Sequence, residues 1–110
     1  MTFDDYQQSA ARTLNPALDR DRRLMDAAAG LAEEAGEVLG HVRKAVYVGH
    51  PLDRERLTKE LGDALWCIAA LATTLDLRLT DVAEANLAKL RARYPQGFSA
   101  EASIRREDAK

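Results

Sequence analysis

The sequence predicts an all-α fold, a compact four-helix bundle with a short C-terminal tail. Apolar residues recur at alternating steps of four and three over long stretches, which is the spacing of one face of an α-helix. Glycine and proline interrupt this pattern at a few points, and no segment alternates strictly between apolar and polar residues as a half-buried strand does. The length of 110 residues, with 31% charged and 46% hydrophobic residues, fits one globular domain over residues 1–110.

The first two helices are predicted from their start signals and their breaks. The first begins after Thr2, an N-cap followed by acidic residues, and ends at Asn15-Pro16. The second runs from about residue 22 to residue 47 and ends at the sequence VGHP, residues 48–51. Its apolar stripe consists of Leu24, Ala28, Leu31, Ala35, Val38, Val42 and Ala45.

Two further helices and a tail complete the predicted fold. The third helix runs from Asp53 to about Leu75, and the fourth begins at Thr80, a good N-cap, and stops before Pro95. Residues 95–110 are predicted to form an extended or weakly structured tail. The apolar stripe of the third helix consists of Leu57, Leu61, Leu65, Ile68 and Ala72.

The third helix also predicts self-association. Every residue of Ala64–Ala72 is apolar, so this part of the helix is hydrophobic all round and not only along one stripe. Three other helices in so short a chain do not easily cover every face of it. We therefore expect a homo-oligomer, a homodimer or a homotetramer; the alternative is a fully buried central helix in a monomer.

The composition excludes several kinds of partner. With a net charge of −2 the chain has no basic field for nucleic acid, and its longest apolar run is too short to cross a bilayer. The N-terminal sequence MTFDDY is acidic and lacks the layout of a signal peptide. The lone Cys67 is expected to be a buried, reduced thiol. We expect a cytoplasmic protein that binds neither nucleic acid nor membranes.

Two clusters of carboxylates are the most informative feature. Glu33, Glu34 and Glu37 lie close together on the second helix, with no Lys or Arg one turn away to offset their repulsion. Glu60 and Asp63 share one face of the third helix, where Arg56 and Lys59 precede them by one turn and partly compensate them.

An antiparallel hairpin would bring the two clusters together. Folding the second and third helices about the VGHP break places residue 37 level with residue 60, and residue 34 level with residue 63, beside the apolar core. Four carboxylates at one level favour a divalent cation, and oxygen ligands favour Mg²⁺, Mn²⁺ or Ca²⁺ over zinc. The alternative is that these acids are solvated. A di-iron site is excluded, because neither His41 nor His50 follows a glutamate by three residues.

These residues resemble the EExxE…ExxD signature of the MazG-like all-α nucleoside triphosphate pyrophosphohydrolases. EEAGE at 33–37 and ELGD at 60–63 carry the signature. The similarity covers nearly the whole chain. It includes FDDYQ at 3–7, KELGDALW at 59–66, NLAKLRARYP at 86–95, and the tail residues Gly97, Phe98, Ser103 and Arg106.

The resemblance implies a MazG-like bundle that hydrolyses a nucleoside or deoxynucleoside triphosphate to the monophosphate and pyrophosphate, a house-cleaning activity on the nucleotide pool. By analogy Glu34, Glu37, Glu60 and Asp63 would hold Mg²⁺, which Mn²⁺ can replace. Glu33 would support these ligands or orient the attacking water, which makes all five acids catalytic candidates. The alternative is a non-catalytic helical module that senses nucleotides or binds a partner.

Candidate substrate-binding residues lie mainly on the fourth helix. Asn86, Lys89 and Arg93 share one of its faces, where the cations can neutralise phosphate oxygens and the amide can hydrogen-bond phosphate or sugar. Lys44 is a further phosphate candidate, and Trp66 is a candidate for stacking on a base. His41, one turn after Glu37, is expected to be exposed.

Overall fold

The computed structural model describes all 110 residues, and every regular element in it is helical. The prediction of an all-α fold is confirmed, but there are five α-helices and not four. A π-helical turn, Lys44–Val48, extends the second helix, and a short 3₁₀ helix, Glu107–Ala109, ends the chain. The α-helices are α1 (Phe3–Ala11), α2 (Arg20–Arg43), α3 (Arg54–Thr74), α4 (Leu79–Arg93) and α5 (Ala100–Arg105).

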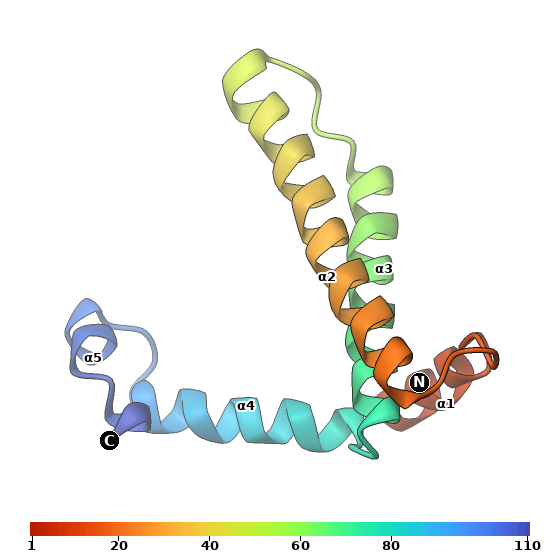
Figure 1. Cartoon of the computed structure of the whole chain (residues 1–110). Helices are drawn as coiled ribbons and strands as arrows, with labels where there is room; N and C mark the ends of the chain where they lie inside the picture. Colours follow the sequence, from red (N-terminus) through yellow and green to blue (C-terminus); the bar gives the residue numbers. More distant parts are fainter.

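The centre of the fold is the antiparallel hairpin of α2 and α3 (Figure 1). Both helices start at aspartate caps, since the carboxylates of Asp19 and Asp53 accept hydrogen bonds from the first-turn backbone. A β-carbon built on Gly30 would lie 3.0 Å from the Sγ atom of Cys67, so the two backbones approach closely there. This contact belongs to the same register that sets residue 34 level with 63, as the sequence predicted.

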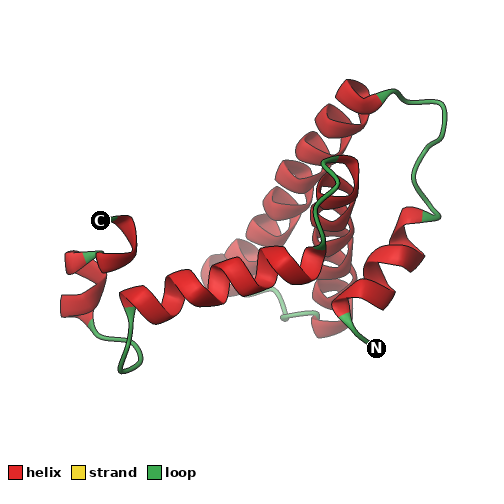
Figure 2. Cartoon of the chain, turned by 90° about the horizontal axis from the view of Figure 1, so that it is seen from below, coloured by secondary structure: helices red, strands yellow, loops and turns green.

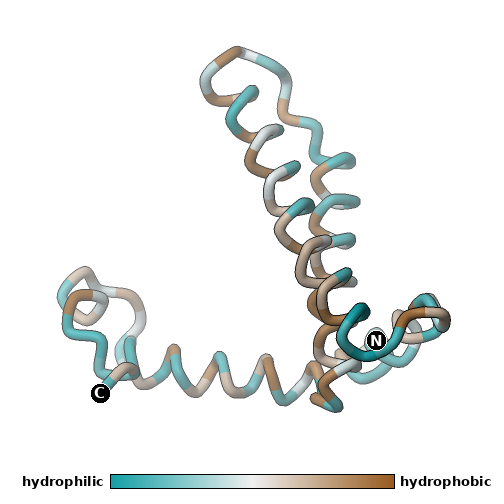
Figure 3. Tube along the Cα trace, in the orientation of Figure 1, coloured by the Kyte–Doolittle hydropathy of each residue, from teal (hydrophilic) through white to brown (hydrophobic).

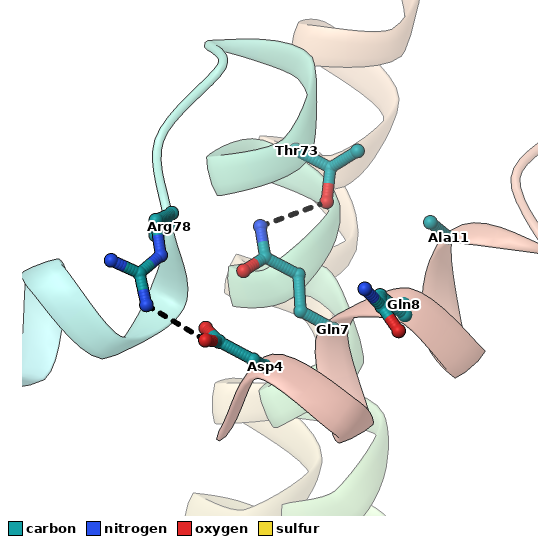
Figure 4. Close-up of a pocket in the computed structure, with 6 residues that line it drawn as sticks. All are labelled: Asp4, Gln7, Gln8, Ala11, Thr73 and Arg78. Atoms are coloured by element: carbon teal, nitrogen blue, oxygen red, sulfur yellow. Dashed lines mark hydrogen bonds and ion pairs between the residues drawn. The ribbon is translucent and has the colours of Figure 1, made fainter. Parts of the chain in front are cut away.

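Helix α1 fixes the corner between α3 and α4 (Figure 4). The side-chain amide of Gln7 donates to the Oγ1 atom of Thr73 at 3.1 Å and to the Leu77 carbonyl at 2.8 Å. The Gln7 carbonyl oxygen accepts from the Leu79 backbone N–H at 2.7 Å. These bonds tie α1 to the Thr73 side chain near the end of α3, to the connecting loop at Leu77 and to the first backbone N–H of α4.

Thr80 is not the N-cap that the sequence predicted. The N-cap is Arg78, two residues earlier, so α4 begins at Leu79, and no side chain caps it. The Thr80 hydroxyl instead donates to Asp4 at 3.0 Å, and the same carboxylate accepts from Arg78 at 2.7 Å. The prediction failed because the hydroxyl found a partner on another helix.

The chain is not a compact bundle. Its radius of gyration is 17.0 Å, whereas a compact domain of this length has about 13 Å. Helix α4 runs away from the hairpin and carries α5 at its far end (Figures 1 and 2). Sequence patterning predicted helices that close on one another, but α4 packs mainly at its first turns and on the C-terminal segment.

The C-terminal segment is folded and not an extended tail. Ser99 caps α5 by accepting from the Ala102 N–H at 3.0 Å. Arg93 at the end of α4 binds Asp108 through two bonds, Nε to Oδ1 at 2.7 Å and Nη2 to Oδ2 at 2.8 Å. The Asp108 side chain is 1% exposed. This two-bond pair is the strong geometry for guanidinium and carboxylate, and it fastens the tail to α4.

Apolar surface remains widely exposed on the single chain. Only eight residues are buried, and none of them has a large side chain that is fully enclosed. Most of Ala64–Ala72 is covered, but Ile68 is not, so the third helix is not the fully buried centre of a monomer. Figure 3 shows apolar residues spread along α4 as well. The exposed residues on α3 and α4 include Leu61, Ile68, Val82, Leu87 and Leu90. No helix is both long and apolar enough to span a membrane.

Candidate metal and nucleotide site

Helix α2 turns one of the three acidic side chains of its glutamate cluster toward α3. Glu34 is half-buried, and its Oε2 atom is buried with no hydrogen-bond partner. Glu33 and Glu37 flank it and are exposed. A buried carboxylate oxygen without a partner carries a desolvation cost that nothing in the chain offsets. Glu34 is therefore the acid of this cluster whose burial is best explained by a bound ligand.

Helix α3 places Glu60 deeper than the sequence suggested. The apolar stripe predicted this residue on the flank, but Glu60 is 6% exposed while Leu61 is 58% exposed. The inward face of α3 carries Glu60 and Cys67. The Arg56 Nε donates to Glu60 Oε1 at 3.0 Å, and Glu60 Oε2 is buried without a partner. Asp63 is exposed and forms no ion pair, so the expected compensation by Lys59 is absent.

The electrostatics of Glu34 connect the two helices. Burial raises the pKa of Glu34, and the carboxylates of Glu37, Asp63, Glu33 and Glu60 raise it further. The acids of both clusters therefore lie near enough to repel one another at Glu34, as the hairpin register predicted. Burial also raises the pKa of the Cys67 thiol, followed by the repulsion of Glu34. Cys67 is a buried free thiol, as expected.

The donors at this level suit a hard divalent cation. Carboxylate oxygens are the ligands that Mg²⁺ and Mn²⁺ prefer, and Glu34 and Glu60 each present a buried oxygen with no other partner. As placed, no three His, Cys, Asp or Glu side chains are close enough together to hold a metal ion. Glu37 and Asp63 are exposed and form no ion pair, so their side chains are free to rotate toward such an ion.

The α4 candidates lie away from these carboxylates in the same chain. Helix α4 leaves the hairpin at the α3 corner (Figure 1). Asn86 and Lys89 on this helix are exposed, and their side chains form no hydrogen bond or ion pair. Arg93 is held by Asp108, which raises the pKa of Arg93 and holds the pKa of Asp108 well below its usual range. Sequence reasoning missed Asp108, because nothing in the spacing of the tail links it to Arg93.

The two remaining substrate candidates lie on the hairpin. Trp66 is half-buried on α3, and its indole N–H donates to the Thr13 hydroxyl at 2.7 Å, which anchors the ring beside the end of α1. Lys44, in the π-helical turn, is exposed and forms no ion pair. Lys44 borders a pocket that also contains Glu37.

This pocket at the open tip of the hairpin has a volume of about 520 Å³ and no hydrophobic lining residue. His41 lines it and is half-buried, which corrects the expectation of an exposed side chain. The Asp53 N–H donates to His41 Nε2 at 3.0 Å and so joins α2 to the start of α3. The sequence does indicate a basic pocket here, since His41, Lys44 and His50 all lie close to the same turn.

Two further pockets lie at α1. An apolar one of about 450 Å³ is lined by Phe3, Tyr6 and Leu65 among others. Burial raises the pKa of Tyr6, and the charge of Asp63 raises it further, so Tyr6 lies near the acidic cluster. The other, of about 340 Å³, is the polar corner of Asp4 and Gln7, and none of the candidate acids lines it (Figure 4).

Comparison with known proteins identifies the family of the chain. Residues 24–98 match the family model of the MazG nucleotide pyrophosphohydrolase domain, and that segment contains all five candidate acids. The Gene 37 protein of Mycobacterium phage L5 is 36% identical over 105 residues, which cover 88% of this chain and 92% of that protein. No solved structure matches the chain. The chain belongs to the MazG nucleotide pyrophosphohydrolase family.

Proposed function

We propose that this protein hydrolyses a nucleoside or deoxynucleoside triphosphate to the monophosphate and pyrophosphate in a Mg²⁺-dependent reaction. One observation carries the proposal. Glu34 and Glu60, on the two facing helices, each have a buried carboxylate oxygen without a partner. Proteins seldom bury an unpaired carboxylate unless a ligand or a proton neutralises it, and one cation could bind the carboxylates of both residues.

In this proposal Glu34, Glu37, Glu60 and Asp63 would hold Mg²⁺, and Mn²⁺ could substitute for it. The bound ion would polarise phosphoryl oxygens and neutralise the charge of the leaving group. Glu33, exposed beside Glu34, accepts a hydrogen bond from the attacking water and takes its proton. The water oxygen bonds to phosphorus, the bridge between the α- and β-phosphoryl groups breaks, and pyrophosphate leaves with the electron pair of that bridge.

We further propose that the working unit is a homodimer or homotetramer, with the site near a subunit boundary. The exposed apolar residues of α3 and α4, Leu61 and Leu87 among them, are the surface that a second copy would cover. Asn86 and Lys89 project from α4 without partners, and a neighbouring copy offers them carboxylates and substrate that their own chain does not. Trp66 would lie beside the base.

The single domain, residues 1–110, would act on the nucleotide pool of the cytoplasm, where a house-cleaning role fits. The free, buried Cys67 is in keeping with a reducing compartment. The second candidate function is a non-catalytic nucleotide sensor or partner-binding module with the same fold. It is favoured only by the absence of a formed group of three metal-binding side chains.

Product analysis separates the two candidates. The protein is incubated with a panel of common and modified nucleoside triphosphates in Mg²⁺ or in EDTA, and the products are resolved by anion exchange. We expect monophosphate and pyrophosphate from at least one nucleotide, in Mg²⁺ only. Binding of nucleotides without any product would support the sensor.

A further inference from the structure

The polar pocket at the hairpin tip has the chemistry of an anion site. Of its lining residues, Lys44, Arg56, His41 and His50 are basic, and only Glu37 and Asp53 are acidic. Asp53 is occupied, because its carboxylate caps α3 through the Arg56 N–H at 3.0 Å. The pocket therefore faces solvent with more donors than acceptors.

Two of these basic side chains have no partner in the chain. The backbone N–H of His50 donates to the Lys44 carbonyl at 3.2 Å, but the side chains of both residues are exposed and form no hydrogen bond or ion pair. By contrast, the His41 ring accepts from the Asp53 N–H at 3.0 Å and Arg56 binds Glu60 at 3.0 Å. Lys44 comes from the π-helical turn and His50 follows the left-handed Gly49, with a φ of 85°. The turn thus brings a lysine ammonium and an imidazole to one pocket from opposite sides of a chain reversal.

The pocket is continuous with one end of the carboxylate pairs. Glu37 lines it, and Arg56 links it to Glu60, the residue level with 37. The other level, Glu34 and Asp63, adjoins Tyr6 and the apolar pocket that Tyr6 and Phe3 line. The site therefore has a cationic end at the hairpin tip and an apolar end at α1.

We propose that the hairpin-tip pocket binds the pyrophosphate part of the substrate, through Lys44 and His50. The nucleotide then lies along the hairpin with its terminal phosphates toward the tip and its base toward α1. This inference rests on the proposed function for its substrate, but it concerns which residues of the chain bind the leaving group. The sequence predicts the main phosphate contacts on α4, with Lys44 as a further candidate, whereas this inference gives the terminal phosphates to Lys44 and His50.

The position of α4 supports the tip over α4 as the site of the terminal phosphates. The Arg93 guanidinium is already bound by Asp108 at 2.7 and 2.8 Å. Lys89 lies on a helix that leaves the hairpin, whereas Lys44 shares a pocket with the candidate ligand Glu37. Lys44 needs no second copy of the chain to act.

The test is calorimetric titration of the full chain with inorganic pyrophosphate in millimolar Mg²⁺. We expect Lys44→Ala to weaken binding by on the order of tenfold or more, as loss of a charged hydrogen bond does, and His50→Ala to weaken it in the same direction. Arg43→Ala is the matched control, because it removes the same charge one residue away, outside the pocket, and it should bind within twofold of wild type. Melting curves verify that each variant is folded.

Titration with a nucleoside monophosphate gives the orientation. Lys44→Ala should leave monophosphate binding within twofold, whereas Tyr6→Ala should weaken it and leave pyrophosphate binding unchanged. Equal pyrophosphate binding by wild type and Lys44→Ala, or a loss caused by Lys89→Ala instead, overturns the inference. If wild type releases pyrophosphate from nucleotides but Lys44→Ala leaves KM unchanged, the tip assignment fails and the proposed function stands. If pyrophosphate binding depends on Lys44 but no nucleotide is hydrolysed, the tip assignment stands and the proposed function fails.

Discussion

Glu34 and Glu60 lie on facing helices of the α2–α3 hairpin, and each has one buried carboxylate oxygen that no group of the chain satisfies. The two oxygens come from the two helices of the hairpin, whose backbones approach closely at Gly30 and Cys67. Strain of this kind persists where function requires it.

Replacing Glu34 with Gln should change how stability depends on pH. Burial and neighbouring carboxylates raise the pKa of Glu34 above its ordinary value of 4.5, so the folded chain holds this proton to higher pH than the unfolded chain. The free energy of unfolding therefore falls as pH rises from 4.5 through the raised pKa. Above that pKa the folded chain carries the full cost of an ionised Glu34. In EDTA, Glu34→Gln should melt higher than wild type at pH 7, and the difference should vanish near pH 4.

The measurement is a series of melting curves in EDTA between pH 4 and pH 8. Glu55→Gln is the control, because Glu55 is an exposed acid on α3 with no ion pair. A difference between wild type and Glu34→Gln that is the same at every pH would show that Glu34 is solvated.

Glu37→Gln or Asp63→Asn should lower kcat a hundredfold or more, about 2.7 kcal/mol of transition-state stabilisation. Each change removes a charge while keeping the shape of the side chain, and both residues are exposed, so folding is preserved. Steady-state assays of pyrophosphate release check this, with Glu55→Gln expected to match wild type. Activity within threefold of wild type would identify the two as ordinary surface acids.

The exposed apolar surface predicts a self-associated protein. Light scattering should give two or four times 12.2 kDa, and Leu61→Glu, at a side chain that is 58% exposed in the single chain, should shift the mass downward without lowering helix content. Burying a new charge in an interface is costly, whereas the same charge in solvent is not. A mass near 12.2 kDa for wild type across micromolar concentrations contradicts the prediction.

Asp108→Asn should loosen the C-terminal segment. The pKa of Asp108 is lowered by Arg93, so its contribution to stability is present above its ordinary value of 3.8 and is lost as pH falls below it. At neutral pH the variant should melt lower and be cut faster by trypsin after Arg105 and Arg106. Glu107→Gln, whose side chain is 48% exposed, is the control. Equal cleavage of Asp108→Asn and wild type would show that the ion pair does not hold the segment.

The hairpin was predictable because its information is local. The apolar spacing of four and three residues identifies the facing sides of α2 and α3, and VGHP identifies the turn between them. Together they predict that residue 34 lies level with residue 63. The depth of Glu60 was not predictable, because patterning assigns apolar side chains to the interior. The pattern placed Leu61 on the inward face of α3, but in the structure Leu61 is exposed and the neighbouring Glu60 is buried.

The direction of α4 could not be read from the sequence. It is set by Gln7 and Asp4, which bind Leu77 and Arg78, 70 and 74 positions later in the chain. Helix α5 carried a signal that was overlooked, since Ser99 is a good cap, but six residues are too few to show an apolar stripe. The polar pocket at the tip depended on a turn whose geometry no spacing rule supplies.

Four melting curves test the metal site most directly: wild type and Glu34→Gln, each in EDTA and in millimolar Mg²⁺. Ligand binding to the folded state raises stability by RT ln(1 + [Mg²⁺]/Kd), so a lost ligand shows as a smaller rise. The account predicts that Mg²⁺ raises the midpoint of wild type clearly and that of Glu34→Gln much less. Equal rises, or no rise in either protein, would contradict it.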